Sequence, residues 1–148
     1  MISPELLRRY PHFTGVTEDC LKDIAMVSEK KQFSVGDDLV REGNPATKLF
    51  LMISGEMHII YRLGDDSEVI ADSLVSGDAF GWSALLEPHV LTASCRASKA
   101  GELIEIDAEK LRSICAENIT CGYQILQEVS KILRDRLSAM RVQIAVQS

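Results

Sequence analysis

Residues 77 to 86 read Gly77-Asp78-Ala79-Phe80-Gly81-Trp82-Ser83-Ala84-Leu85-Leu86, and a short run, Leu91-Thr92-Ala93, follows them. The two glycines predict a tight turn, and the residues after Gly81 predict a short helix. A helix that starts at a glycine turn directs several backbone N–H groups at one point, which suits an anionic ligand. We therefore predict a ligand site formed by Phe80, Gly81, Trp82, Ser83, Ala84, Leu91, Thr92 and Ala93.

Short apolar runs broken by glycine fill the middle of the chain, from Lys31 to Ile106. Turn signals recur at roughly ten-residue spacing and separate about eight runs, which is typical of antiparallel strands in a small barrel, roll or sandwich. Outside this region the apolar residues have helical spacing, with Thr17 and Asp107 placed as N-caps. The sequence therefore predicts an α+β fold, mainly β with flanking helices.

The length of the chain fits a single domain. It has 148 residues, of which 46% are hydrophobic, and this is enough for one core and too short for two of ordinary size. We divide the predicted domain 1–148 into N-terminal helices over 1–30, the β region over 31–106 and C-terminal helices over 107–148.

The segment Glu42–Glu56, EGNPATKLFLMISGE, resembles the glycine-punctuated signature of the cyclic-nucleotide-binding domain family. The two glycines of the 77–86 segment follow it at the distance found in that family. The family includes the sensor halves of catabolite-activator-type transcription factors and the regulatory subunits of cyclic-nucleotide-dependent kinases. The resemblance implies an antiparallel, jelly-roll-like β-roll with N-terminal helices and a long C-terminal helix.

The ligand-binding segment departs from the family at two positions. In the family, a Glu after the second glycine holds the ribose hydroxyl and an Arg before the Thr/Ser-Ala pair holds the phosphate, whereas this chain has Trp82 and Leu91. DNA-binding members also contact the base through hydroxyl groups on the long helix, where this chain has Arg136-Leu137-Ser138. The resemblance thus implies a pocket of this family without its two charged ligand contacts.

The charge around this segment argues against a phosphate ligand. No Arg or Lys lies between Ser76 and Ser94, and the one histidine there, His89, is of a type mostly neutral near pH 7. A charged hydrogen bond contributes roughly 1.5–3 kcal/mol, so losing two predicts binding of cyclic AMP and cyclic GMP weakened at least about a hundredfold. The Trp82 indole either fills the volume of the sugar or encloses a flat, less charged ligand.

A long helix is predicted from Ile119 to at least Ile144. Apolar residues with one polar interruption recur along it at spacings of four and three, which is typical of a helix-pairing seam. The seam consists of Leu126, Ser130, Leu133, Leu137, Met140 and Ile144. A second stripe, Ile125, Val129 and Ile132, lies beside its first half. We predict a homodimer through the seam; the alternative is that both stripes pack within one chain.

The net charge of −6 argues against nucleic-acid binding, and no helix-turn-helix is predicted after the long helix. No apolar run approaches the ~20 residues that cross a bilayer, so we predict no membrane contact. The N-terminus lacks the pattern of a signal peptide, which favours a cytoplasmic protein.

The four cysteines, Cys20, Cys95, Cys115 and Cys121, form no C-x-x-C pair, and we expect reduced, buried thiols rather than a metal or redox site. The histidines are equally dispersed, and no nucleophile elbow or paired carboxylates accompany them. The sequence therefore predicts no metal, no cofactor and no enzyme activity.

Together these features predict a stand-alone ligand-sensing or regulatory module that does not bind cyclic AMP or cyclic GMP in the family's usual way. We expect it to act as a homodimer, with a possible small-molecule ligand and a partner protein. One alternative is a genuine but atypical cyclic-nucleotide-binding signalling protein. Another is a protein-interaction module with a plugged pocket.

Overall fold

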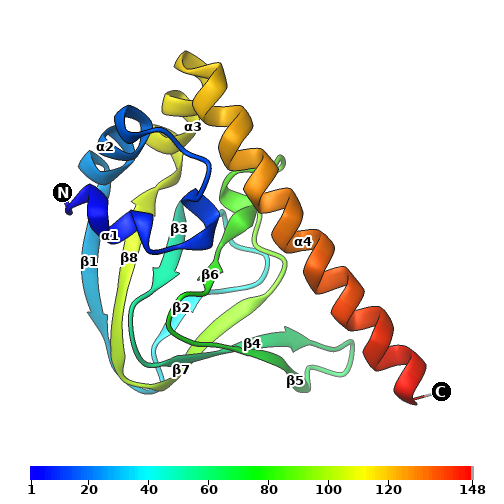
Figure 1. Ribbon diagram of the computed structural model, residues 1–148. Coiled ribbons are helices and arrows are strands. Elements are labelled where there is room, and N and C mark those ends of the chain that lie inside the picture. The colour runs from blue at the N-terminus through cyan, green and yellow to red at the C-terminus, as the bar shows by residue number, and fades with distance from the viewer. Residues whose placement is uncertain (148) are drawn as a thin grey trace.

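The computed structural model describes residues 1–147, which form two four-stranded antiparallel sheets and flanking helices (Figure 1). Ser148, part of the predicted domain, lies outside the described residues. The N-terminal helices are α1 (Pro4–Arg8), the 3-10 helix η1 (Pro11–Phe13) and α2 (Glu18–Met26). The strands are β1 (Ser28–Phe33), β2 (Asp38–Val40), β3 (Lys48–Met52), β4 (Glu56–Arg62), β5 (Glu68–Leu74), β6 (Ala79–Phe80), β7 (Ser94–Lys99) and β8 (Gly101–Asp107). The 3-10 helix η2 (Trp82–Ala84) follows β6, and α3 (Ala108–Glu117) and α4 (Ile119–Gln147) follow β8.

One sheet has the strand order β1-β8-β3-β6, and the other has the order β2-β7-β4-β5. The predicted α+β roll is therefore confirmed. The roll begins at Ser28, earlier than the predicted boundary at Lys31, because β1 pairs with β8 from Ser28 opposite Ile106 to Phe33 opposite Gly101. The residues between these two ends of β1 are exposed and polar, so no apolar alternation marks the strand in the sequence.

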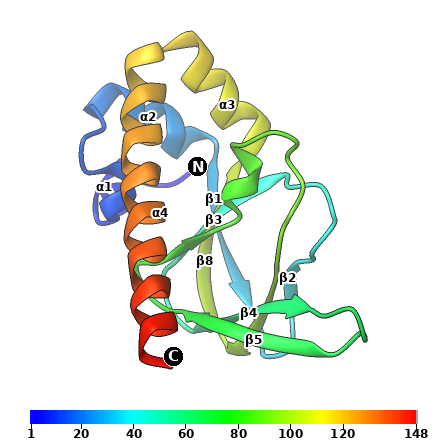
Figure 2. The same cartoon turned by 90° about the vertical axis from the view of Figure 1, so that its right-hand side faces the viewer.

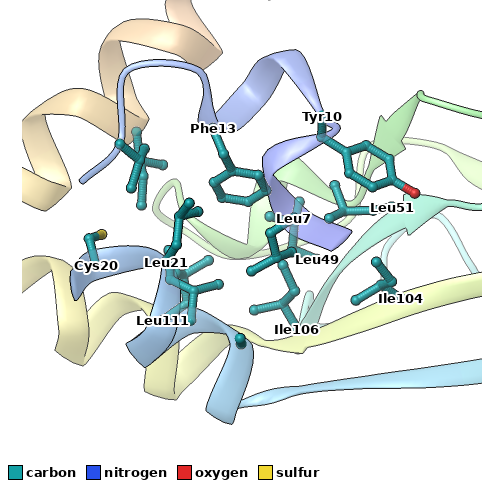
Figure 3. Packing of buried hydrophobic residues seen from close by; sticks show 14 of the residues in the cluster. Leu7, Tyr10, Phe13, Cys20, Leu21, Leu49, Leu51, Ile104, Ile106 and Leu111 are labelled. Atoms are coloured by element: carbon teal, nitrogen blue, oxygen red, sulfur yellow. The ribbon is translucent and has the colours of Figure 1, made fainter. Parts of the chain in front are cut away.

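Alternate residues of β3 and β8 point to two hydrophobic clusters on opposite faces of the first sheet. The outer cluster packs the helices against this sheet and contains Leu49, Leu51, Ile104 and Ile106 from the strands (Figure 3). Its other members are Leu7, Tyr10, Phe13, Val16, Cys20, Leu21, Ile24, Ala25, Ala79, Leu111, Cys121, Ile125 and Val129.

The inner cluster fills the space between the two sheets. It contains Phe50 and Met52 from β3, which alternate with the outer-cluster residues of that strand. Its other members are Phe33, Val40, Ala46, Met57, Leu74, Phe80, Ala84, Leu91, Cys95, Ala97, Leu103 and Ala108. The β-roll interior is thus largely occupied by the protein's own side chains.

Helix α4 starts beside α3 and runs past the roll to the level of the β4–β5 hairpin (Figures 1 and 2). Within residues 119–146, the buried side chains of α4 are Cys121, Ile125 and Val129, which lie in the outer cluster. These buried residues include two of the three residues of the predicted second stripe, which therefore packs within the chain in its first half. The predicted caps are also present: Thr17 Oγ1 accepts a hydrogen bond from the Cys20 amide and Asp107 Oδ1 from the Lys110 amide.

The prediction of four reduced cysteines was wrong for two of them. Cys20 of α2 and Cys121 of α4 form a disulfide, and their Cα atoms are 5.9 Å apart. Cys95 and Cys115 are free thiols. A sequence separation of 101 residues gives no local spacing signal, and the two cysteines meet only in the folded chain, where both are buried in the outer cluster.

Candidate functional site

The predicted turn and short helix are present at the centre of the molecule. The Asp78 carboxylate accepts a hydrogen bond from the Val75 amide at 2.9 Å and so closes the first turn. Strand β6 then pairs Phe80 with Phe50 of β3. Gly81 has a φ of 82°, in the left-handed region that glycine favours, and η2 begins directly after it. We call residues Gly77–Ala93 the cassette.

Fewer amide groups are available at η2 than the sequence predicts. The Ala84 amide donates to the Gly81 carbonyl at 3.0 Å, inside the turn itself. The carbonyl of Ala84 accepts a hydrogen bond from Arg112 Nη1 of α3 at 2.5 Å, which ties the end of η2 to the C-terminal helices. One hydrogen bond within the turn and one from α3 therefore hold η2 in place.

The second arm of the cassette is fixed by backbone pairing with the segment before β3. The Gly43 amide donates to the Leu91 carbonyl at 2.8 Å, and the Leu91 amide donates to the Asn44 carbonyl at 2.9 Å. This pairing directs the Leu91 side chain into the inner cluster, where it is only 7% exposed. An apolar residue is thus buried where the resemblance expects the phosphate-binding arginine.

Three of the eight predicted site residues come together in the roll interior. Phe80 stacks on Phe50, with ring centroids 4.6 Å apart and an interplanar angle of 10°. Ala84 and Leu91 belong to the same inner cluster. These contacts close the interior beside Gly81 with apolar surface.

Trp82 lies apart from that group. Its indole packs against the outer cluster and tilts against His12 of η1, with ring centroids 5.3 Å apart. The indole therefore faces the outer side of the cassette and not the roll interior. The remaining predicted residues, Ser83, Thr92 and Ala93, are half-buried or exposed.

His12 is a buried polar group beside the cassette. It is 4% exposed, and its Nδ1 has no hydrogen-bond partner in the part of the chain that the structure describes. Burial lowers the pKa of His12 to about 4, and the positive charge of Arg136 acts in the same direction. The imidazole is consequently neutral at pH 7.

A cavity of about 380 Å³ borders the inner cluster next to Leu91 and Phe50. We call it the roll-mouth cavity. Its polar lining combines two cations, Arg41 and Lys48, with two carboxylates, Asp38 and Glu105. The other lining residues are Leu39, Val40, Asn44, Pro45, Ala46 and Thr47. The volume is within the range of small-molecule sites.

The sequence did not reveal the ion pair in this cavity. Lys48 Nζ donates to Glu105 Oε2 at 2.8 Å, between the first residue of β3 and the interior face of β8. This hydrogen bond raises the pKa of Lys48, so the ammonium group stays charged. The position of Lys48 could have been predicted from its spacing. Lys48, Phe50 and Met52 are two residues apart on one strand, so their side chains point to the same face.

Comparison with known proteins identifies the family to which this fold belongs. The model of the cyclic nucleotide-binding domain matches residues 30–118, which is more than half of the chain. The chain belongs to the cyclic nucleotide-binding domain family. A solved structure named as a candidate cyclic nucleotide-binding protein of Geobacter metallireducens has a TM-score of 0.83 and 36% sequence identity. That match covers 93% of this chain and 99% of the other.

Curated relatives carry this domain inside longer proteins. The CRP-like cAMP-activated global transcriptional regulator of Mycobacterium tuberculosis is 26% identical over 88% of this chain, which spans 58% of that regulator. A cGMP-dependent protein kinase of Caenorhabditis briggsae is 25% identical over 88% of this chain, and the match spans 18% of the kinase. The domain thus occurs in regulators and also as part of enzymes.

The remaining predictions concern the α4 seam, metal binding and membrane contact. The seam residues Leu126, Leu133, Leu137 and Met140 of α4 are between 46% and 58% exposed, and Ser130 Oγ donates to the Leu126 carbonyl. Among residues 1–147, no group of three or more His, Cys, Asp or Glu side chains is placed to hold a metal ion. No helix in the same range is both long and apolar enough to cross a membrane.

Proposed function

We propose that this chain is a non-catalytic ligand-sensing module of the cyclic nucleotide-binding domain family whose site does not hold cyclic AMP or cyclic GMP in the family's usual way. The observation that carries this proposal is the burial of Leu91 in the inner cluster. A phosphate placed against Leu91 would lose water there without gaining a free cation, because Arg41 and Lys48 of the neighbouring cavity are already paired with Asp38 and Glu105. Such desolvation costs several kcal/mol.

The roll-mouth cavity supports a ligand of a different class. Its cations and carboxylates are equal in number, and Lys48 is already paired with Glu105. A balanced lining of this kind suits a small polar molecule without net charge, such as a zwitterion, better than a phosphate anion.

Two other functions have specific support. The stacked Phe50 and Phe80 rings and the buried Leu91 also fit a plugged pocket in a protein-interaction module. A genuine cyclic-nucleotide ligand is supported by the relatives, one of which is named as cAMP-activated. In each case we propose a cytoplasmic homodimer that acts through a partner protein and does not contact nucleic acid.

Nucleotide affinity tests the proposal directly. We would measure calorimetric affinity for cyclic AMP and cyclic GMP in the wild type, in Trp82→Glu, in Leu91→Arg and in the double variant. We expect no binding by the wild type at micromolar nucleotide and a gain of at least about tenfold in Leu91→Arg, because it regains the phosphate cation. Trp82→Glu should add little in the double variant, because residue 82 packs against the outer cluster and not in the roll interior. Leu91→Met is the matched control and should gain nothing. Tight nucleotide binding by the wild type would refute the proposal.

The homodimer is tested by the α4 seam. Leu133→Asp with Leu137→Asp places two charges on the exposed apolar face, and we expect light scattering to show a monomer where the wild type is a dimer. Leu63→Asp is the control, because Leu63 is 49% exposed but lies on the β4–β5 hairpin. A monomeric wild type at micromolar concentration would contradict the proposed dimer.

A further inference from the structure

The disulfide between Cys20 and Cys121 joins the first turns of two helices. Each cysteine is the third residue of its helix, α2 or α4. The Cys20 amide donates to Thr17 Oγ1 and the Cys121 amide to Asn118 Oδ1, so both first turns are capped in the same way. The first turn of a helix favours the thiolate, the form of cysteine that reacts with oxidants.

The bond is the first anchor of α4. Cys121, Ile125 and Val129 are the buried residues of this helix in the described chain, and every described side chain after Val129 is half-buried or exposed. Only the Cys121 anchor is covalent. Gly122 adds a close approach to α3, because a Cβ placed there would lie 2.9 Å from the Cys115 carbonyl oxygen. The attachment of the long helix to the domain is therefore concentrated at its N-terminal end.

Reduction would leave the other anchors in place. Ile125 and Val129 remain in the outer cluster whether or not the sulfurs are bonded, so the domain keeps its fold as a dithiol. The covalent restraint alone is lost. A cross-link over 101 residues removes much of the entropy of the unfolded chain and so raises the free energy of unfolding. The same bond also restrains local opening at the base of α4.

We propose that Cys20 and Cys121 form a reversible redox latch that fixes the base of α4 on α2. A hydroperoxide closes it: one thiolate attacks the peroxide oxygen to give a sulfenic acid and release water or an alcohol, and the second thiol displaces water from that sulfur to form the disulfide. A dithiol opens it by exchange, becoming a cyclic disulfide while both cysteines regain their protons.

The burial of the pair sets how the latch reacts. Cys20 is 0% and Cys121 1% exposed, so either reaction requires the first turn of α4 to open. Cys115 is only half-buried and should be alkylated before them. Cys95 and Cys115 provide internal controls because neither is bonded to a second cysteine. Burial raises the pKa of both thiols, that of Cys95 to about 12.

The test uses the intact protein treated with hydrogen peroxide or with dithiothreitol. Alkylation after denaturation, read by mass spectrometry, should label Cys95 and Cys115 in the oxidised form and all four cysteines in the reduced form. We expect reduction to lower the melting temperature by roughly 10 °C. It should also speed amide hydrogen exchange over residues 119–129 at least about tenfold.

Variants separate the latch from general thiol chemistry. Cys115→Ser should keep the full difference between the two treatments, whereas Cys20→Ser and Cys121→Ser should abolish it. If the serine variants fail to fold, the comparison of the two wild-type forms still decides the question. Labelling of all four cysteines after peroxide would overturn the proposal. So would a disulfide that forms without changing melting or exchange. Neither result depends on which ligand the roll binds.

Discussion

The outer and inner clusters lie on opposite faces of one sheet, yet they are closed in different ways. The outer cluster is sealed by three N-terminal helical segments, α3 and the start of α4, with Leu7, Phe13 and Leu21 at most 1% exposed. The inner cluster borders the roll-mouth cavity and meets the Lys48–Glu105 pair. The difference shows that the helical frame and the roll-mouth cavity occupy separate volumes, so the lining of the cavity can change without disturbing the packing of the helices.

The cassette spans both volumes. Trp82 packs into the outer side against His12, whereas Leu91 is buried in the inner cluster. In the sequence the two residues look equivalent, because the resemblance expects a charged group at each position. Their surroundings differ, because Trp82 packs against the outer cluster and Leu91 gives the roll interior an apolar surface.

The largest effect should come from removing a large side chain in each cluster. We expect Phe13→Ala to lower the free energy of unfolding by about 3–5 kcal/mol, because the closed outer cluster would keep a dry void. Phe50→Ala should cost at least about 1 kcal/mol less, because Phe50 borders an existing cavity into which the new space opens. Urea unfolding of both variants measures this, and equal costs would show that the inner cluster is as closed as the outer one.

The pH dependence of stability should report on the outer side of the cassette. The pKa of His12 is about 4 in the folded state and about 6.5 in the unfolded chain. Between these values the unfolded chain binds the proton and the folded protein does not, so stability falls as pH decreases from 6.5 towards 4. We expect a loss of about 2 kcal/mol from pH 7 to pH 5.

The control variants for this effect are His12→Phe and His89→Asn. His12→Phe should flatten the pH dependence between pH 4 and 6.5. His89→Asn should leave it unchanged, because His89 has a φ of 59° that asparagine tolerates and lies outside the outer cluster. A profile that stays equally steep in His12→Phe would mean that other groups control acid sensitivity.

The fold was largely predictable from the sequence because its signals are local. The Thr17 and Asp107 caps, the turn at Gly81 and the helical stripe through Ile125 and Val129 all depend on residues within a few positions of one another. The start of the roll at Ser28 was missed because an exposed edge strand needs no apolar alternation.

The site was only partly predictable because it depends on contacts far apart in the sequence. Lys48 and Glu105 are 57 residues apart, and Cys20 and Cys121 are 101 apart. No spacing pattern reports such pairs. The sequence also did not predict that Trp82 and Leu91 point to opposite sides of the cassette. The direction of Trp82 depends on the packing of η1 against its indole.

The smallest difference, about 1 kcal/mol between two variants, should come from the residue at which the cassette passes from one cluster to the other. Gly81 has a φ of 82°, and a Cβ there would lie 2.8 Å from the Lys48 carbonyl oxygen. Gly43 has a similar φ of 88° but nothing within 4 Å of its Cβ position, so it is a matched control for backbone strain alone. We expect Gly43→Ala to destabilise the protein by about 1 kcal/mol and Gly81→Ala by about 1 kcal/mol more, since only the second forces β3 away from β6.

Thermal and urea unfolding of the two variants measure the difference. If Gly81→Ala cost no more than Gly43→Ala, the cassette would be free to shift against β3. In that case the close approach of Gly81 to Lys48 would not be what keeps Trp82 in one cluster and Leu91 in the other.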